Sequence, residues 1–529
     1  RPPPATTSHH LVVPGLYRIR ASMHARNTDK PIPVSIGLIS TDRFGHEKIE
    51  HLLDIRDAFP NKPRVVEVTA HLPVNEQVYL SPNSLTLFRN MQTPDKKPAF
   101  PDFENDPLLA VDWIEIEGPL NEIDGYRDYF SGLPRVPARF YEDTMAGKQV
   151  QDWTRMHPNE FLKPHNRLRL MSASPKEHGE LFVRRFLRRV FRGLANDETN
   201  KLFVARFQQL LEGGERLEDA LLTVYKEALC SPHFLFRIEE PAELDDFALA
   251  SRLSYFLWSS APDDELLDLA AAGGLSNADT LHAQTDRMLE DPRGERFVRS
   301  FSGQWLELDK LHDMKPDKIY FEYDEDLMWS MGEETHLFFK EVLLRDLPVT
   351  EFIDSDWSFL NQRLAQNYGI EGVIGMDMRR VGLPEDSHRG GVITQASILK
   401  LTTNATYTSP IKRGAWILDR ILGTPPSPPP PAIEAIEPDI RGAVTIREQM
   451  DLHKNQQVCA SCHVQIDPPG FALENFDVVG GWREKYRVAS GSDDTDRRAR
   501  FDDVADAIFV PAGFDNGAQH GTEFVGAFA

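Results

Sequence analysis

The segment Cys459-Ala460-Ser461-Cys462-His463 constrains this chain more than any other stretch of its sequence. Two cysteines three positions apart, followed at once by a histidine, form the pattern by which proteins attach haem covalently. On one helical turn both sulfur atoms can form thioethers with the haem vinyl groups, while the histidine reaches the iron as its proximal ligand. The pattern therefore predicts a c-type haem bound through Cys459, Cys462 and His463.

A structural zinc ion is the alternative occupant of the same residues. Cys459, Cys462 and His463, joined by His453 six positions before the first cysteine, form a donor set that zinc accepts. Structural zinc sites more often use two separated pairs of ligands, and the chain has only three cysteines in 529 residues. The close spacing of two of those cysteines favours haem over zinc or a chance match.

The residues after the histidine supply groups that can orient its ring. Asp467-Pro468-Pro469-Gly470 begins four positions beyond His463. We expect the backbone carbonyl groups of this segment to accept the N–H of the proximal imidazole, because such a bond sets both the tautomer and the ring angle of a metal-bound histidine.

Four sequence segments occur in an order that can be compared with the domain order of known families. They are 231–236 (SPHFLF), 359–369 (FLNQRLAQNYG), 389–397 (RGGVITQAS) leading into 408–414 (TSPIKRG), and 459–483, which holds the haem motif and ends in GGWR. Together they resemble the large planctomycete-type cytochrome c proteins, a family of multi-domain chains with uncharacterised domains and a C-terminal haem segment. The resemblance spans roughly residues 175–529 and implies haem c as the cofactor, attached outside the inner membrane.

Length and charge narrow the remaining possibilities. A chain of 529 residues is too long to fold around a single hydrophobic core, so its length predicts three or four domains. The formal net charge of −23, without a compensating basic segment, argues against binding to a nucleic-acid backbone. No apolar run approaches the ~20 residues that span a bilayer. The chain starts at Arg1 without a methionine, so we expect a processed or trimmed piece of an extracytoplasmic protein, periplasmic or at the cell surface.

Short stretches of alternating apolar and polar residues occupy the first 120 positions. The stretches 16–23, 34–39, 65–69, 78–80, 85–88 and 110–116 predict the strands of a β-sandwich. The last of them, within 111–119, resembles the closing strand of calcium-dependent carbohydrate-binding jelly rolls. The resemblance implies a carbohydrate-binding module with a polysaccharide partner and a calcium candidate at Asp112, whereas alternation alone would give Asp112, Glu115 and Glu117 a solvated face.

Helical periodicity dominates after residue 177. Eight stretches show 3.6-type apolar spacing with capping residues: 180–191, 197–211, 216–229, 245–258, 262–271, 278–290, 295–311 and 325–345. We therefore expect a multi-domain fold, an N-terminal jelly-roll-like β-sandwich followed by a mainly α-helical body with a C-terminal helical cytochrome c-like haem segment. The expected segments are the β-sandwich (1–120), an irregular connector (121–177), a helical array (178–345), a helical domain with a pocket-lining loop (346–423), a polyproline spacer (424–431), the c-type haem segment (432–489) and a truncated C-terminal domain (490–529).

Two of these segments lack regular periodicity for different reasons. The polar run 402–409 lies between helical stretches and can either line a pocket or satisfy its own backbone through turn hydrogen bonds. The segment 424–431 has six prolines in eight residues, which fix an extended conformation and predict a stiff spacer before the haem segment.

For three groups of side chains outside the haem segment, the sequence favours a role in packing or at the surface over a role in function. Cys230 follows apolar residues at helical spacing and is expected to be a buried, inert thiol. The arginines of 184–192 are expected on a solvated face with acidic neighbours rather than in a docking patch. Aromatic residues at apolar helix positions are expected in hydrophobic cores; they are Phe234, Phe236, Tyr255, Phe256, Trp258 and Trp305.

Three classes of function fit this outline. The first is electron transfer with a redox partner protein, by a monohaem c-type cytochrome linked to polysaccharide binding or breakdown. The second is a haem-dependent oxidative enzyme, peroxidase- or oxygenase-like, that acts on polysaccharide. The third is a structural zinc or binding protein. Nothing in the sequence shows a distal acid–base pair for peroxide cleavage, and residue type alone identifies no catalytic triad in a chain with 17 histidines. Both observations favour electron transfer.

The sixth ligand of the iron separates the first two classes, because a closed site exchanges electrons while an open one binds oxygen or peroxide. His453 and Met450 lie nearest in sequence, but each would have to cross the haem edge to reach the distal face. More often such a residue bonds a haem propionate. We expect the sixth ligand to come from outside 445–470, with candidates in the helical body at Met378, His388 and Met171.

Overall fold

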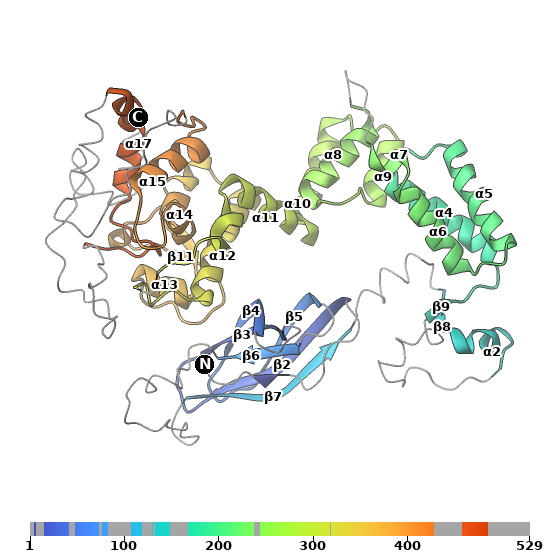
Figure 1. Cartoon of the computed structure of the whole chain (residues 1–529), viewed down its shortest axis with the longest axis horizontal. Helices are drawn as coiled ribbons and strands as arrows, with labels where there is room; N and C mark the ends of the chain where they lie inside the picture. The colour runs from blue at the N-terminus through green and yellow to red at the C-terminus, as the bar shows by residue number, and fades with distance from the viewer. Residues whose placement is uncertain are drawn as a thin grey trace. The chain divides into compact units, whose positions relative to one another are not determined.

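The computed structural model describes residues 5–6, 15–41, 48–72, 77–82, 107–118, 130, 133–148, 168–236, 244–317, 319–427 and 457–484. Within these residues, β-strands make up the regular structure of the first 118 positions and helices dominate from residue 175 onward, as the ribbon of Figure 1 shows. The chain divides into two compact units. The first comprises 1–27, 36–54 and 59–297, and the second comprises 28–35, 55–58 and 298–529.

The N-terminal part contains two β-sheets, with strand orders β1-β6-β3-β4 and β5-β2-β7. The strands are Ala5–Thr6 (β1), Gly15–Arg26 (β2), Ile32–Thr41 (β3), Lys48–Ala58 (β4), Arg64–Leu72 (β5), Gln77–Ser81 (β6) and Leu108–Glu117 (β7). Strands of both sheets contribute to one apolar cluster, formed by Tyr17, Ile19, Leu38, Leu72 and Val78. A shared cluster between two sheets is the core of a β-sandwich, so the sequence prediction of N-terminal sheets is confirmed, while the jelly-roll resemblance stays a prediction.

Strand β4 shows where alternation fails as a signal. Its apolar residues include the adjacent pair Leu52 and Leu53, followed by Ile55 and then Ala58, so no period of two is visible. The sequence pattern consequently did not predict β4, nor the two-residue β1. The expected stretch 85–88 lies outside the described residues.

The expected connector 121–177 contains regular structure within its described residues. Strands Arg135–Pro137 (β8) and Leu168–Leu170 (β9) pair antiparallel, and Tyr141–Met145 (α2) is a short helix. Leu170 is buried in the same apolar cluster as the helices that follow. These residues are therefore part of a packed domain.

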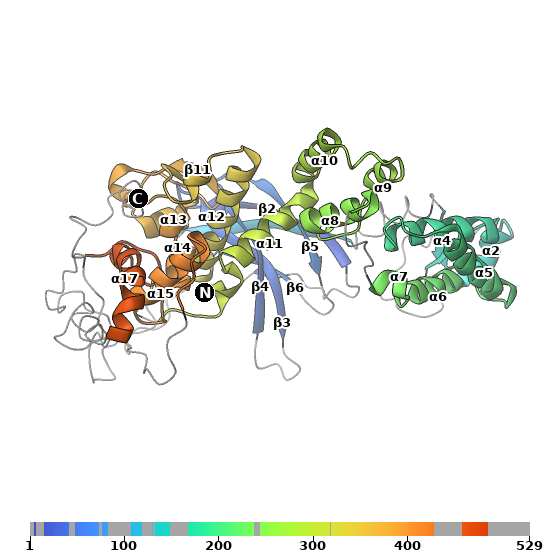
Figure 2. The ribbon, with the colours of Figure 1, turned by 90° about the horizontal axis from the view of Figure 1, so that it is seen from above.

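The helices of the first unit correspond to six of the eight predicted stretches, apart from the short helix Pro232–Leu235, which was not predicted. They are Pro175–Val190 (α4), Asp197–Glu212 (α5), Leu217–Leu229 (α6), Pro232–Leu235 (α7), Asp246–Trp258 (α8), Asp264–Ala271 (α9) and Ala278–Glu290 (α10). Helices α4, α5 and α6 lie side by side in Figures 1 and 2 and share a core that includes Phe182, Phe207 and Leu221. Asn196, Asp245 and Asp263 begin α5, α8 and α9, because each side chain accepts a hydrogen bond from a first-turn N–H.

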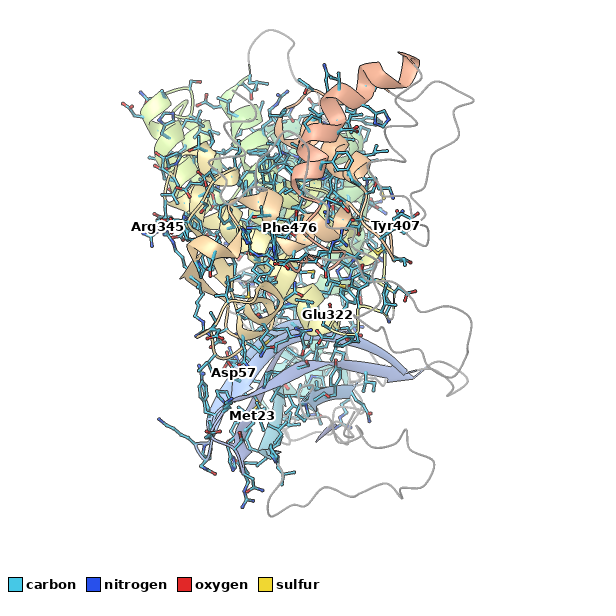
Figure 3. The ribbon with its side chains drawn as sticks, turned by 90° about the vertical axis from the view of Figure 1, so that its left-hand side faces the viewer. Met23, Asp57, Glu322, Arg345, Tyr407 and Phe476 are labelled. Carbon is cyan, nitrogen blue, oxygen red and sulfur yellow. The ribbon has the colours of Figure 1, made fainter. Side chains whose placement is uncertain are left out.

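The helical body continues into the second unit. Its elements are Glu295–Trp305 (α11), Glu325–Leu344 (α12), Trp357–Leu360 (β10), Gln362–Tyr368 (α13), Arg379–Gly382 (β11), Ala396–Leu401 (α14), Pro410–Trp416 (α15) with a π-helical continuation Ile417–Ile421, and Gln457–Ala472 (α17). The core of this unit includes Phe338, Trp357, Ile393 and Phe476, the last of which is labelled in Figure 3. Among the described residues, no helix has the length and apolar composition that crossing a membrane requires.

Candidate haem-binding segment

Helix α17 carries both cysteines and the histidine of the haem motif. Since the backbone from Gln457 to Ala472 is helical, Cys459 and Cys462 stand almost one turn apart, and His463 follows Cys459 by four positions. The thiol of Cys462 is partly buried and is not part of a disulfide. The backbone therefore places the three residues of the motif within little more than one helical turn.

The ring of His463 is held by a carboxylate. Its Nδ1 atom lies 2.8 Å from Oδ1 of Asp467, one helical turn further along, and the residues are 8% and 4% exposed. Sequence reasoning predicted a backbone carbonyl as the acceptor, which is wrong for this helix, because helical carbonyls point along the axis while side chains four apart share a face. With a proton on Nδ1, the lone pair of Nε2 is the one that can bind iron, so the histidine fits a haem.

Two prolines interrupt the hydrogen bonding of α17 just beyond the motif. Pro468 and Pro469 lack the N–H groups that would bond to the carbonyls of Val464 and Gln465. Both of those residues are exposed, so water can hydrate the carbonyl groups. The helix therefore persists as far as Ala472.

Helix α15 packs against α17 at the level of the backbone. A Cβ atom added to Gly414 would overlap the carbonyl group of Ile466, and one added to Gly470 would overlap the carbonyl oxygen of Pro410. Figures 1 and 2 both show the two helices side by side. Glycine on each side is therefore what permits this close approach.

Arg413 on α15 anchors the chain that follows α17. Its Nη1 atom donates to the carbonyls of Leu473 (2.5 Å) and Phe476 (2.9 Å), and Nη2 donates to that of Asp477 (3.2 Å). The guanidinium is fully buried and lies 3.6 Å from the buried carboxylate of Glu474. A buried cation is tolerated here because several acceptors and one opposite charge surround it.

Glu474 connects this anchor to the segment's end. Its carboxylate accepts hydrogen bonds from Arg483 (2.8 Å) and from the hydroxyl of Thr408, and Arg483 also donates to Thr408 (2.7 Å). Trp482 stacks on His388 with ring centroids 3.9 Å apart. The stretch 473–483 is thus fixed to the body by ionic, polar and aromatic contacts.

A second buried polar cluster surrounds Glu334 of α12. Its carboxylate accepts from Ser358 (2.7 Å) and from the hydroxyl of Tyr368 (2.5 Å), and complete burial raises the pKa of Glu334 to about 7. Burial also raises the pKa of Tyr368 well above its usual value. The guanidinium of Arg389 lies 3.3 Å above the Tyr368 ring and donates to Gly480, at the end of the haem-bearing segment. The cluster thereby joins α12, α13 and the segment after α17.

Two threonines of the loop 402–409 form local hydrogen bonds. Thr402 and Thr403 donate to backbone carbonyls one turn earlier, while Asn404 and Tyr407 close a turn through a backbone hydrogen bond. Thr408 contributes to the anchor around Glu474. These contacts agree with the turn interpretation of the loop, and a pocket-lining role stays a prediction.

The other candidate ligands lie in different places. His453 and Met450 are outside the described residues. Met378 is partly buried against an apolar cluster of the second unit, His388 stacks on Trp482, and Met171 belongs to the first unit. The structure identifies none of them as the sixth ligand.

Asp112 occupies a β-bulge. In the pairing of β2 with β7, Ser22 faces Trp113 and Met23 faces Val111, so Asp112 is the extra residue. Its carboxylate accepts a hydrogen bond from Ser22 at 2.8 Å and lies 4.0 Å from Nδ1 of His24. No group of three or more His, Cys, Asp or Glu suited to a metal occurs in the part of the chain that is described. The calcium candidate stays a prediction.

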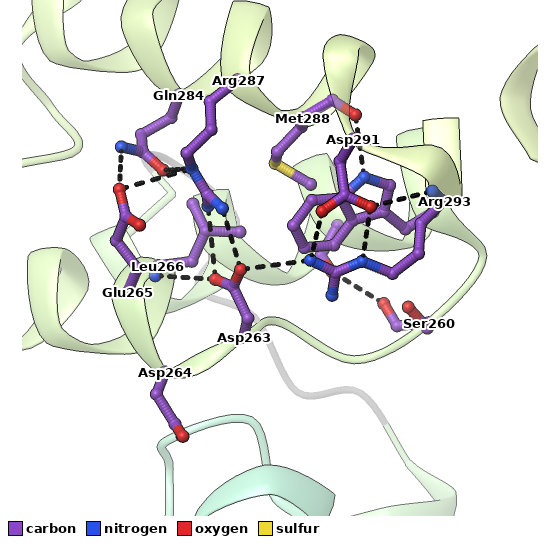
Figure 4. Close-up of polar contacts among 12 residues, drawn as sticks. Ser260, Asp263, Asp264, Glu265, Leu266, Gln284, Arg287, Met288, Asp291 and Arg293 are labelled. Carbon is purple, nitrogen blue, oxygen red and sulfur yellow. Dashed lines mark hydrogen bonds and ion pairs between the residues drawn. The ribbon is translucent and has the colours of Figure 1, made fainter. Parts of the chain in front are cut away.

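A separate polar centre in the first unit includes the ion pair of Asp291 with Arg293, which Figure 4 labels. The guanidinium of Arg293 lies 3.4 Å above the ring of Trp258, and the indole N–H of Trp258 donates to the carbonyl of Met288 at 2.9 Å. Arg293 makes two hydrogen bonds of 2.8 Å to Asp291, and this contact lowers the pKa of Asp291 to about 2. The centre joins α8, α10 and the turn that follows α10, which is a structural role.

Two interpretations of side chains outside the haem segment need correction. Cys230 is exposed at the end of α6, since the last turn of that helix lies at the surface. Of the six aromatic residues expected in cores, Trp258 is fully buried, but Phe236, Phe256 and Tyr255 are 64%, 59% and 39% exposed. By contrast, Arg188 and Arg189 pair with Asp268 and Asp264, as expected for a solvated face with acidic neighbours.

The carboxylates of Asp467 and Glu334 are the main site residues that sequence reasoning missed. A signal for Glu334 was available, because it continues the helical spacing of Leu327 and Met331 toward Phe338, four residues on, all buried on one face of α12. A charged residue on such an apolar face indicates a buried, hydrogen-bonded group. Asp467 was noticed only for its backbone.

N-terminal sheets, a helical body and a C-x-x-C-H helix define a class, multi-domain proteins with a cytochrome c-type motif near the C-terminus. Three models of domains described as proteins of unknown function match the chain: DUF1595 (PSD5) over residues 179–239, DUF1592 (PSD4) over 244–370 and DUF1588 (PSCyt3) over 389–486. These are domains of the planctomycete cytochrome c family, and the chain belongs to that family. No curated protein and no solved structure matches it.

Proposed function

We propose that this protein is an extracytoplasmic monohaem c-type cytochrome that exchanges electrons with a redox partner protein. The observation that carries the proposal is the helix α17, on which the motif Cys459, Cys462 and His463 is followed by the carboxylate that holds the histidine ring. Membership in a family with a domain named for cytochrome c supports it. Because bacteria attach haem c outside the inner membrane, the same motif supports the location.

The residues of the segment have distinct roles in this proposal. Haem c, when bound, supplies one-electron chemistry at its iron. Cys459 and Cys462 would hold it through thioethers, and His463 would bind its iron through Nε2. Arg413 fixes the chain beyond the helix, so the site lies on an anchored element.

Two alternatives make different spectroscopic predictions. A peroxidase- or oxygenase-like enzyme acting on polysaccharide requires an open iron position and a high-spin spectrum that changes with cyanide. A structural zinc protein has no haem spectrum.

Optical spectra of oxidised and reduced protein, with and without cyanide, test the proposal. We expect the spectrum of a low-spin six-coordinate haem. Cyanide should not change this spectrum, and the His453→Ala variant should show the same spectrum. A high-spin, cyanide-binding wild type would instead support the enzyme. If only the His453→Ala variant becomes high-spin and binds cyanide, His453 is the sixth ligand and our expectation of a ligand outside 445–470 is wrong.

Polysaccharide binding by the N-terminal sheets is a second candidate, favoured by one exposed ring. Trp113 on β7 is 43% exposed, and the ion pair of Arg20 with Glu115 (2.9 Å) lies beside it on the same face of the sheet. An indole ring can stack on a sugar while neighbouring charged groups bond to its hydroxyls.

Affinity electrophoresis of the protein through gels containing different glycans tests this candidate. At least one glycan should retard the wild type and the control Phe321→Ala, which removes another exposed ring, but not Trp113→Ala. Loss of retardation in chelator would support calcium near Asp112. If no glycan retards the wild type, the candidate is abandoned.

A further inference from the structure

The geometry points to Asp467 as a positioning residue that lowers the reduction potential of the haem by holding the proximal histidine through a buried, negatively charged acceptor. The inference rests on the proposed function, because it concerns a haem bound to His463. It adds a determinant of how readily that haem gives up an electron.

The contact has the features of a strong hydrogen bond. Nδ1 of His463 and Oδ1 of Asp467 are 2.8 Å apart, and only 10% and 5% of the two side chains are exposed. Hydrogen bonds that involve an ionised partner are shorter and stronger than neutral ones. Exclusion from water strengthens the bond further, since the local dielectric constant is lower than that of water.

A carboxylate acceptor affects the iron in one direction. When it accepts the Nδ1 proton, electron density shifts toward Nε2 and the imidazole becomes a more basic ligand. A more basic ligand, and a negative charge nearby, stabilise the ferric state over the ferrous state. Reduction adds one electron from the redox partner, no bond breaks, and the proton stays on Nδ1. The predicted result is a lower potential than a neutral acceptor would give.

A purely structural role for the same pair makes a different prediction. Carboxylate and imidazole side chains four residues apart stabilise a helix by a few tenths of a kcal/mol when exposed. Their loss would weaken α17 without changing the balance between the ferric and ferrous states. The reduction potential therefore separates the two roles.

Spectroelectrochemical titration of the haem-loaded protein is the test. In Asp467→Asn we expect the equilibrium constant for reduction to rise at least tenfold, which is about 59 mV for a one-electron couple. Asp467→Glu, which keeps the carboxylate, should change it less than Asp467→Asn does. The control Glu484→Gln removes an exposed charge of the same segment and should leave it within threefold of wild type. A rise below tenfold in Asp467→Asn overturns the inference.

A measurement on the wild type covers the case in which Asp467→Asn does not fold. The infrared difference spectrum between oxidised and reduced protein should contain a carboxylate band that moves when aspartate is labelled with carbon-13. Absence of such a band overturns the inference. If the wild type holds no covalent haem, the proposed function itself fails. If the haem titrates reversibly but its reduction potential does not depend on Asp467, only this inference is contradicted.

Discussion

Glu334, Arg389, Arg413 and Glu474 are ionisable residues at buried positions where apolar side chains are usual. Each is surrounded by hydrogen-bonding groups from other segments, so their desolvation is offset by specific contacts. Removing one partner would leave the other charge buried and unpaired, which typically costs about 3–5 kcal/mol. These residues therefore determine how the segment around α17 is held.

Glu334 should make stability depend on pH. Its pKa is about 7 in the folded protein against a usual 4.5, so between these values the folded state keeps a proton that the unfolded state releases. The free energy of unfolding should therefore fall as pH rises from about 4.5 to 7, by on the order of 3 kcal/mol in total. Below this window the effect is absent, and above it the full loss remains.

Urea unfolding of Glu334→Gln at pH 5 and pH 7.5 checks this prediction. The variant cannot ionise, so its loss of stability between the two pH values should be smaller than that of wild type. Glu325→Gln, which removes an exposed carboxylate from the same helix, should behave as wild type. Equal pH dependence in wild type and Glu334→Gln would show that Glu334 does not titrate in this range.

At the residue scale, the sequence predicts the residues that bind the haem more readily than it predicts the side chains that hold those residues in place. Cys459, Cys462 and His463 are adjacent in the chain, so spacing alone indicates their shared chemistry. Glu334, Tyr368 and Arg389 meet only after folding. Asp467 required knowing that the backbone stays helical up to the residue before Pro468, a position where proline normally disfavours a helix.

At the scale of elements, the contact of α15 with α17 depends on glycine. A Cβ atom at Gly414 would overlap the backbone of Ile466, whereas one at Gly332 of α12 would meet nothing closer than a methyl group of Leu311 at 3.7 Å. Both glycines lie within helices. The two positions therefore differ in the space available rather than in helical setting.

Alanine substitutions at these two glycines should have opposite effects. Gly414→Ala should destabilise the protein by about 1–3 kcal/mol through overpacking and should reduce the haem retained per chain. Gly332→Ala should be neutral or stabilising by up to about 1 kcal/mol, because alanine favours a helix. Chemical denaturation together with haem content measures both effects. A Gly414→Ala variant as stable as Gly332→Ala would contradict the close approach of the helices.

Periodicity predicted the elements where one face is apolar. Apart from the short α7, which was not predicted, the helices from α4 to α12 agree with the predicted stretches because 3.6-residue spacing and Asn or Asp caps coincide, as at Asn196 and Asp245. The stretch 295–311 ended earlier than predicted, at Trp305, and continues as a separate 3-10 turn from Leu308 to His312. Strand β4 was missed because its apolar residues do not alternate with polar ones.

At the scale of the whole molecule, motif order predicted the family better than it predicted structure. The four sequence segments identified the family that the domain models then matched. Three of those segments meet around the chain that follows α17. Arg389 lies over the Tyr368 ring and donates to Gly480, and Arg413 donates to Leu473. That convergence could not be predicted, because two of its side-chain contacts join residues 60 and 91 positions apart in the sequence.

Covalent attachment of haem is the central claim, and extraction of denatured protein with acidified organic solvent tests it most directly. Haem colour should stay with the wild-type chain and with Cys230→Ala, which removes the exposed cysteine outside the motif. It should be lost from the double variant Cys459→Ala with Cys462→Ala, and metal analysis should find iron. Complete extraction of haem from the wild type, or zinc without iron, would contradict the account.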